Sequence, residues 1–401
     1  MGRSRTVRPL LAAASLASAA CTFTGLGNYD VATCSTPTGF TTTVQQVGAV
    51  SSSELTFASS NGASPIGAFP SQSGGGSCAQ AVDGSGYVES SSCTFFVGLA
   101  PEQPWVIPLG GGHAAVAATT TAPCTEGAIA FQYIGQSVGG STPPAATCGA
   151  GAALPSVAAL AVDGSTALVT WYDTAYSTRS DPIQSCAGAK PAPLMAAVVN
   201  GATSSNVSLG MPVTLTSAGT SVRPAAMAQV PGQPQVAVAA PDGNDVSVWM
   251  LDSSLSTGNA TTVPALAGAY AASLAAATDG SGRIAVVAEI GCTPQSIALA
   301  VGTVSGGFSG GTVVAPAGSS AAVQPTVAWV ASENGWIVAW ISAEGGAHAL
   351  AQRFDADGDA VGGRIDPSTP ATGASVAADG SLFAYVPASN SFVSASLGCA
   401  E

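Results

Sequence analysis

One pattern of apolar and polar positions returns several times after residue 150. A short strand of alanine and valine leads into a turn with glycine, a second apolar strand follows, and a more polar strand often comes third. The copies are SVAALAVDGSTALVTWYD (156–173), RPAAMAQVPGQPQVAVAAPDG (223–243), ASLAAATDGSGRIAVVAE (272–289), QPTVAWVASENGWIVAWI (324–341) and GASVAADGSLFAYVPA (373–388). Short apolar runs bounded by turn residues predict antiparallel strands.

The turns of this pattern carry the strongest hairpin signal that a short sequence contains. Asp-Gly occurs at 83–84, 163–164, 242–243, 279–280, 357–358 and 379–380, and Asn-Gly at 61–62, 200–201 and 334–335. These dipeptides favour two-residue type I′ turns, in which both central residues have positive φ. Many hairpins of this kind predict an all-β protein.

The spacing of the repeats predicts how the hairpins assemble. First-turn glycines are expected at Gly84, Gly127, Gly164, Gly232, Gly280, Gly335 and Gly380, with Gly62 as the rival of Gly84 in the first repeat. The mean period is about 49 residues, which is typical of four-stranded propeller blades. We therefore expect a β-propeller of about seven blades.

Two features qualify this fold. The last repeat, from about residue 371, has room for only three strands, and TTTVQQV (41–47) is a candidate for the strand that closes it. The alternative is two β-sandwich domains in series, with residues 139–155 as their linker. A parallel β-helix would need shorter and more regular periods.

The N-terminus predicts export. Three arginines precede an uncharged run from Pro9 to Ala20, and small residues then lead to Cys21. This is the pattern of a secretory signal peptide. We expect residues 1–20 to be the signal peptide, 21–50 an N-terminal tether with the closing strand, and 51–401 the propeller domain.

Cys21 resembles the lipidated cysteine of bacterial lipoproteins, because Ala19 and Ala20 directly precede it, although Ser18 stands where that family usually has leucine. The resemblance implies an exported bacterial lipoprotein with propeller-like repeats, on the outer membrane or the cell surface. Cleavage after Ala19 is the alternative, and it implies a periplasmic or extracellular protein.

The charge of the chain restricts its partners. Only 8% of residues are charged, and without residues 1–20 the chain keeps six basic residues against 22 acidic ones, a formal charge of −16. Such a body repels nucleic acid and anionic lipid surfaces. We expect a protein or glycan ligand, no nucleic acid, and contact with a membrane only through a lipid anchor.

The cysteines predict disulfides, since none has a CxxC spacing and an exported chain is oxidised. If Cys21 carries lipid, eight remain, enough for four bridges. We expect the local pairs Cys78–Cys93 and Cys124–Cys148 and a pair Cys34–Cys399 that ties the termini. The candidates are Cys34, Cys78, Cys93, Cys124, Cys148, Cys186, Cys292 and Cys399.

The stretch RFDADGDAVGG (353–363) is the one candidate metal site. Counted as a calcium loop, its positions 1, 3, 5 and 12 are Asp355, Asp357, Asp359 and Asp366. Position 6 of such a loop needs glycine, and Ala360 stands there, while the bidentate glutamate is missing. We therefore expect a solvated hairpin and no cofactor, with calcium as the alternative.

No catalytic constellation emerges from the sequence. Gly-x-Ser-x-Gly occurs at 135–139 and 307–311, but neither match has the strand-then-helix context of a nucleophile elbow. His113 and His348 lack metal-site spacing. SENGW (332–336) weakly resembles a sialidase hairpin but lacks its aspartate. The tryptophans at strand positions are expected to fill the space between blades, and a sugar-binding platform is the alternative.

The sequence thus favours a non-enzymatic binding or scaffold protein at the cell surface or in the periplasm. The alternative is a secreted glycan-active hydrolase of the sialidase-like propeller type. Glu289, Glu333 and Glu344 are the acids on or near the late repeats that such an enzyme would use.

Overall fold

The computed structural model describes most of the chain between residues 56 and 397. The described ranges are 56–58, 66–70, 77–82, 88–95, 102–110, 113–120, 128–134, 145–148, 152–161, 165–173, 190–202, 207–217, 220–221, 225–243, 245–256, 260–267, 274–291, 296–315, 322–343, 346–367, 370–386 and 391–397. Strands before Ser156 are described by their backbone alone. Cys21, Cys34, Cys124, Cys186, Cys292, Cys399 and the expected closing strand lie outside these ranges.

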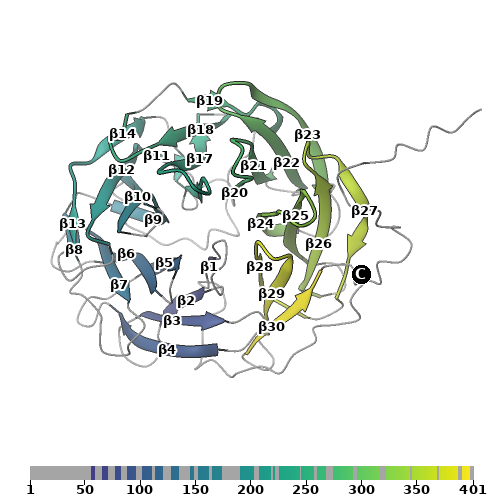
Figure 1. Ribbon diagram of the computed structural model, residues 1–401, viewed down its shortest axis with the longest axis horizontal. Coiled ribbons are helices and arrows are strands. Elements are labelled where there is room, and N and C mark those ends of the chain that lie inside the picture. Colours follow the sequence, from purple (N-terminus) through teal and green to yellow (C-terminus); the bar gives the residue numbers. More distant parts are fainter. Residues whose placement is uncertain are drawn as a thin grey trace, which may run out of the picture.

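Seven antiparallel sheets follow one another along the chain and are arranged as a ring (Figure 1). Among the described residues, five of these sheets have four strands, the third has five, and the last has three. The fold is therefore a seven-bladed β-propeller, as the period predicts, and not two sandwiches. The stretch that would have linked two sandwiches contains β8 and the start of β9.

The first three blades occupy the N-terminal half of the ring. Blade 1 consists of β1 (Thr56–Ala58), β2 (Ile66–Pro70), β3 (Ser77–Val82) and β4 (Val88–Phe95). Blade 2 consists of β5 (Glu102–Gly110), β6 (His113–Thr120), β7 (Ala128–Ile134) and β8 (Ala145–Cys148). Blade 3 consists of β9 (Ala152–Ala159), β10 (Thr166–Asp173), β12 (Leu194–Asn200), β13 (Ser208–Leu209) and β14 (Val213–Thr216).

The last four blades complete the ring. Blade 4 has β16 (Ala226–Gln229), β17 (Val236–Asp242), β18 (Asp245–Leu251) and β19 (Thr261–Thr262), and blade 5 has β20 (Leu274–Thr278), β21 (Ile284–Ile290), β22 (Ser296–Thr303) and β23 (Gly307–Ala315). Blade 6 has β24 (Ala322–Val330), β25 (Gly335–Ser342), β26 (His348–Asp355) and β27 (Ala360–Ile365), and blade 7 has β28 (Gly373–Val376), β29 (Ser381–Val386) and β30 (Ser391–Ser396).

Two small elements lie outside the blades. A ribbon pairs β11 (Lys190–Pro191) with β15 (Thr220–Ser221), and a 3-10 helix, η3, spans Pro264–Leu266. Within the described residues no helix is both long and apolar enough to cross a membrane.

The first strand of each blade lies innermost, and these strands contact one another around the ring (Figure 1). The ring closes where β1 of blade 1 contacts β28 of blade 7. Blade 7 has three strands in the described chain, as the length of the last repeat predicts. Each blade is antiparallel, so its first-to-second and third-to-fourth connections lie at the same end. We call this end of the propeller the hairpin face.

The hydrophobic cores lie between blades and explain why the middle strands are apolar at successive positions. In β21, Ile284, Val286 and Ala288 pack in the cluster shared with blade 4, whereas Ala285 and Val287 pack in the cluster shared with blade 6. Successive side chains of a strand point to opposite faces, so a strand with two buried faces needs apolar residues throughout.

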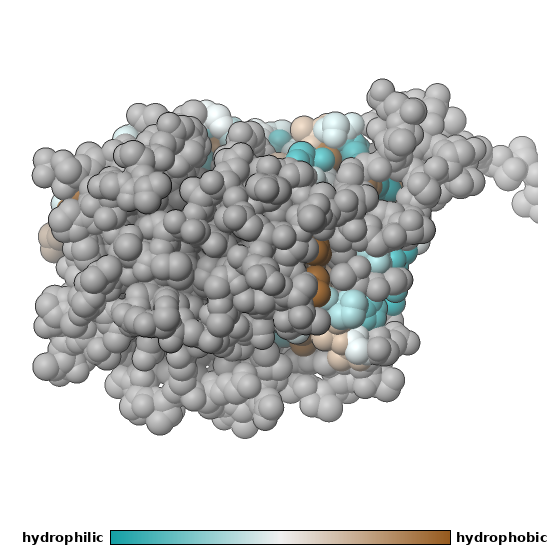
Figure 2. All heavy atoms as spheres, turned by 90° about the horizontal axis from the view of Figure 1, so that it is seen from below, coloured by the Kyte–Doolittle hydropathy of each residue, from teal (hydrophilic) through white to brown (hydrophobic). Residues whose placement is uncertain are grey.

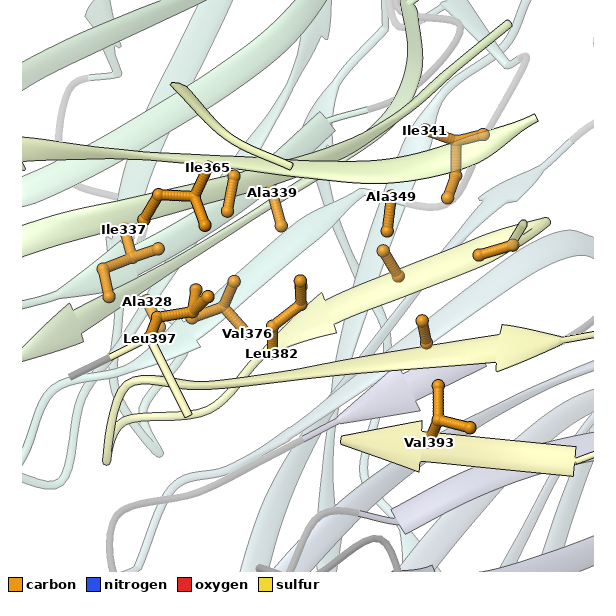
Figure 3. Packing of buried hydrophobic residues seen from close by; sticks show 14 of the residues in the cluster. Ala328, Ile337, Ala339, Ile341, Ala349, Ile365, Val376, Leu382, Val393 and Leu397 are labelled. Carbon is orange, nitrogen blue, oxygen red and sulfur yellow. The ribbon is translucent and has the colours of Figure 1, made fainter. Parts of the chain in front are cut away.

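The same rule positions the tryptophans of blade 6. In β25, Ile337, Ala339 and Ile341 face blade 7 (Figure 3), and Trp336, Val338 and Trp340 face blade 5. The prediction that tryptophans fill the space between blades is confirmed for Trp249, Trp336 and Trp340, which pack in clusters shared by two blades, whereas the buried Trp171 packs in a cluster of blade 3 residues. Trp329 is only partly buried.

Outside the cores between blades, the described surface contains both hydrophobic and hydrophilic residues, as the side of the molecule seen in Figure 2 shows. Two large hydrophobic side chains of the described residues are strongly exposed, Met211 and Val313. They belong to blades 3 and 5 and form no common patch.

Five of the seven glycine anchors fall in or beside the first hairpin of a blade, and two do not. Gly164, Gly232, Gly280, Gly335 and Gly380 have the predicted position. Gly84 lies between β3 and β4, so its rival Gly62, between β1 and β2, is the correct anchor. Gly127 precedes the third strand of blade 2. Similar Ala- and Gly-rich turns precede the second, third and fourth strands of blades alike. For this reason the sequence pattern assigns Gly84 and Gly127 to the wrong turn.

The hairpins are confirmed, but the turn type differs from the prediction. No aspartate of an Asp-Gly pair has a positive φ in the described chain, whereas Gly358 (φ 91°) and Gly380 (φ 83°) do. The backbone bonds Gly358 N to Asp355 O and Asp355 N to Asp359 O define a type I turn followed by a left-handed glycine. The aspartate stays at negative φ, and its glycine alone takes the left-handed position.

Two of the expected disulfides involve residues on described strands. Cys78 lies in β3 and Cys93 in β4, and at their bulge Ser77 pairs with Phe95 and Ala79 with Ser92, so the two cysteines lie in adjacent strands at nearly the same level. Cys148 in β8 pairs with Ala128, which follows Cys124 by four residues in the chain. Both local pairs remain predictions.

Candidate functional site: the junction of blades 5 and 6

Arginine, tryptophan and carboxylate side chains converge on the hairpin face between blades 5 and 6. Trp329 lies near the end of the innermost strand β24, and Trp336 near the start of β25. Arg283 directly precedes β21 of blade 5, and the hairpin Asp355–Asp359 joins β26 to β27. We call the region formed by Arg283, Trp329, Trp336 and this hairpin the blade 5–6 junction.

Asp355 holds the hairpin together from inside. Its Oδ1 accepts hydrogen bonds from the backbone N–H groups of Asp357 (3.0 Å) and Asp359 (2.9 Å). Asp355 is 9% exposed, whereas the side chain of Asp357 is 86% exposed. Asp355 is therefore used as a backbone acceptor, and Asp357 is open to solvent.

The hairpin Asp355–Asp359 packs against strands β22 and β23 of blade 5. The Thr312 hydroxyl of β23 donates to the carbonyl of Gly358 over 2.8 Å. A Cβ on Gly358 would lie 2.9 Å from Val301 Cγ2 of β22, and the φ of Gly358 is in the left-handed region, so only glycine fits without strain. The Ala356 carbonyl accepts from Trp336 Nε1 (3.2 Å) and from Arg283 Nη1 (3.3 Å).

Arg283 is fixed on three sides. Its Nε lies 2.6 Å from Asp279 Oδ2, its Nη1 reaches Ala356, and its guanidinium carbon lies 5.6 Å from the ring centre of Trp329. The Trp329 ring in turn meets Trp336 edge-on, with centroids 4.7 Å apart. These contacts hold the guanidinium in one orientation over an aromatic ring.

Asp279 belongs to the turn before β21. Its Oδ1 accepts the backbone N–H groups of Ser281 (2.8 Å) and Arg283 (3.0 Å). Burial acts to raise the pKa of Asp279, but the hydrogen bonds from Ser281 and Arg283 outweigh it, and the pKa is lowered below its usual value. Asp279 therefore stays ionised and keeps the charge of Arg283 balanced.

A second ion pair lies in blade 6 near the junction. Arg353 Nε lies 3.0 Å from Glu333 Oε2, with both side chains largely buried. The Nε–H of Arg353 does not point at Glu333 Oε2, so the contact is an ion pair without an aligned hydrogen bond. The pair connects β26 to the loop between β24 and β25, within one blade.

The four aspartates of the candidate calcium loop do not gather at one place. Asp355, Asp357 and Asp359 share the hairpin, but Asp366 follows β27 at the opposite end of that strand, 3.7 Å from His348 Nε2. Among the described residues no group of three or more His, Cys, Asp or Glu side chains could hold a metal ion. His113 lies in β6, where only the backbone is described.

The candidate catalytic glutamates are also separated. Glu289 is buried and accepts the backbone N–H of Gln324 (2.6 Å), near the start of β24, whereas Glu333 follows the end of that strand. At about 3.3 Å per residue, the two positions lie roughly 20 Å apart. Glycosidase carboxyl groups need to lie within about 10 Å of each other. Glu344 lies outside the described residues.

The Gly-x-Ser-x-Gly match at 307–311 is part of a strand. Ser309 lies inside β23, the outer strand of blade 5, and not at a strand-to-helix turn. Gly311 in this stretch faces η3, because a Cβ there would lie 2.7 Å from the Cβ of Ala265. Close packing of η3 on β23 accounts for this glycine.

In the sequence, Arg283 belongs to the turn of one repeat and Trp329 and Trp336 belong to the next, and no motif joins them. The local signal was present in DGSGR (279–283), where an Asp and an Arg four residues apart can pair across a turn. Their meeting with the hairpin of the next blade depends on how blades pack, which no single repeat encodes.

Among known proteins, a solved lectin structure resembles this chain in fold. No known protein family matches the chain, and no curated protein does. The BP39L lectin from Burkholderia pseudomallei is similar in structure, with a TM-score of 0.52 and 14% identity over 82% of this chain and 99% of the lectin. The Dos1 propeller gives a TM-score of 0.48 and 11% identity over 84% of this chain and 76% of that one.

Proposed function

We propose that this chain is a non-enzymatic binding protein, exported and held at the cell surface by a lipid on Cys21. The observation that carries the proposal is that four of the described carboxylates on the hairpin face already have partners within the protein, whereas Asp357 is open to solvent. Asp279, Asp355 and Asp379 each accept backbone N–H groups of their own turns, and Glu333 pairs with Arg353. A hydrolase needs acids free to exchange protons with a substrate.

Further support comes from the rigidity of the blade 5–6 junction. Arg283 and Trp336 both donate to the carbonyl of Ala356, and Trp329 packs beneath the guanidinium. A preorganised surface with an exposed charged pair suits recognition, because ligand binding then orders few side chains. The similar lectin structure supports the fold alone at its identity of 14%.

The decisive experiment compares turnover with binding. Purified mature protein, incubated with chromogenic glycosides and a fluorogenic sialoside, is expected to show no hydrolysis above the uncatalysed rate. In parallel, the protein is titrated against immobilised oligosaccharides. Hydrolysis that Glu289→Gln or Glu333→Gln abolishes, while the variant keeps the wild-type melting temperature, would replace the binding proposal with the glycan-active alternative.

The lipid anchor makes a separate prediction. We expect Cys21→Ser to move the protein from the membrane fraction to the soluble fraction, because the variant has no thiol to acylate. Fractionation with immunoblotting and intact-mass spectrometry checks this, and Cys34→Ser serves as the control that should keep the acyl mass. A wild-type protein that is already soluble and begins at Ala20 or Cys21 without acyl mass would disprove the anchor.

A further inference from the structure

We propose that the blade 5–6 junction is a binding site for a neutral saccharide, with Arg283 and Asp357 as its polar contacts and Trp329 as its aromatic wall. The inference rests on the proposed binding function and adds the ligand class and the residues. Three observations lead to it: a fixed guanidinium with free donors, an exposed carboxylate beside it, and the charge of the surroundings.

The guanidinium of Arg283 is held in place, but it keeps N–H donors that make no hydrogen bond to the described residues. Its Nε is taken by Asp279 and its Nη1 by Ala356, whereas Nη2 makes no hydrogen bond to any residue that the structure describes. The side chain is 31% exposed. An arginine that is fixed through two nitrogens and the face of Trp329 can offer its remaining N–H groups to a ligand at low entropic cost.

Asp357 supplies the complementary acceptor. Its Oδ1 lies 3.7 Å from Arg283 Nη1, beyond hydrogen-bond distance, and its side chain is 86% exposed. Donor and acceptor groups thus lie a few ångströms apart, on one side chain that is partly exposed and one that is largely exposed. Two neighbouring sugar hydroxyls fit such a pair, since one can accept from the guanidinium while the other donates to the carboxylate.

The local charge selects a neutral ligand. Asp279 and Asp357 lie beside Arg283, and the hairpin carries two further aspartates, Asp355 and Asp359, so the junction as a whole carries an excess of negative charge. An anionic sugar would be repelled by this excess, and a cation would meet the guanidinium. Trp329, partly exposed at the end of the innermost strand, offers an apolar surface to the C–H groups of a sugar ring.

The experiment uses the mature protein on an array of neutral, sialylated and sulfated oligosaccharides, followed by calorimetric titration of the best ligand. We expect neutral oligosaccharides to bind. Arg283→Lys should weaken that binding about tenfold, because lysine cannot reproduce the fixed fork. Asp357→Ala should weaken it by a similar factor. Asp359→Ala is the matched control, since it removes one carboxylate from the same hairpin without touching Arg283, and its affinity should stay near wild type.

The outcomes separate this inference from the proposed function. If neutral oligosaccharides bind equally well to wild type, Arg283→Lys and Asp357→Ala, the protein is a binding protein but its site lies elsewhere, and the inference is wrong. Binding restricted to sialylated or sulfated sugars, or to no sugar, also overturns it. Hydrolysis of the bound oligosaccharide would overturn the non-enzymatic function while leaving the ligand class in place. Melting temperatures of all variants show whether each is folded.

Discussion

Replacing Trp336 with alanine is expected to lower the free energy of unfolding by about 3–5 kcal/mol, the largest effect of any single substitution proposed for this protein. Trp336 is fully buried in the core shared by blades 5 and 6. Its removal leaves a cavity, and it also deprives the Ala356 carbonyl of one of its two donors. Denaturant titration under non-reducing conditions measures the change.

Trp336→Phe is the control that separates the contribution of packing to stability from that of the hydrogen bond. Phenylalanine keeps much of the volume but cannot donate to Ala356, so we expect a loss of about 1–2 kcal/mol. If alanine and phenylalanine cost the same, the hydrogen bond dominates and the packing argument fails. A loss below about 1 kcal/mol for alanine would mean that the junction is not packed as described.

Replacing Gly335 with alanine should destabilise the protein by about 2 kcal/mol, although only one methyl group is added. Gly335 begins β25 opposite Asp355, and a Cβ there would lie 2.5 Å from the carbonyl oxygen of Phe354. That oxygen belongs to the backbone of the adjacent strand, so the strands must separate where the hairpin begins. Thermal and denaturant unfolding both report this.

Gly363 in the neighbouring strand β27 provides the matched comparison. A Cβ at Gly363 would meet nothing within 4 Å, and the residue is exposed. Gly363→Ala should therefore leave stability unchanged or raise it by up to about 1 kcal/mol, because alanine restricts the unfolded chain. Equal destabilisation by both substitutions would show that loss of glycine flexibility, and not the contact with Phe354, is the cause.

The fold could be predicted because its signals are local and repeated. The Asp-Gly turn of ADGS (378–381) and the apolar strands on each side are visible in a short window, and the same window recurs at a blade-like period. The length of the last repeat predicts three strands, and the described part of the chain has three there. In blade 1 the Asp-Gly pair at Gly84 lies in the outer hairpin, between the third and fourth strands. The sequence of blade 2 contains no Asp-Gly pair, and Gly127 precedes the third strand. Both anchors were therefore wrong.

The turn type and the candidate site depended on information that is not local. Asp355 reads as a metal ligand in sequence, but in the folded hairpin its oxygen is taken by two backbone N–H groups. Arg283 and Ala356 are 73 residues apart and meet only because neighbouring blades pack at a fixed angle. Pattern analysis of one repeat cannot show which side chain of the next blade will face it.

The position of the cores between blades has a consequence for how the protein is made. A lone blade would present two apolar faces to water, since strands such as β21 bury alternate residues against different neighbours. During synthesis, each newly emerged blade therefore exposes one apolar face until its successor covers it. The apolar face of blade 6 that packs on blade 7 is covered only when β28–β30 have emerged. Truncation within the last repeat should thus produce aggregation-prone chains rather than a shorter propeller.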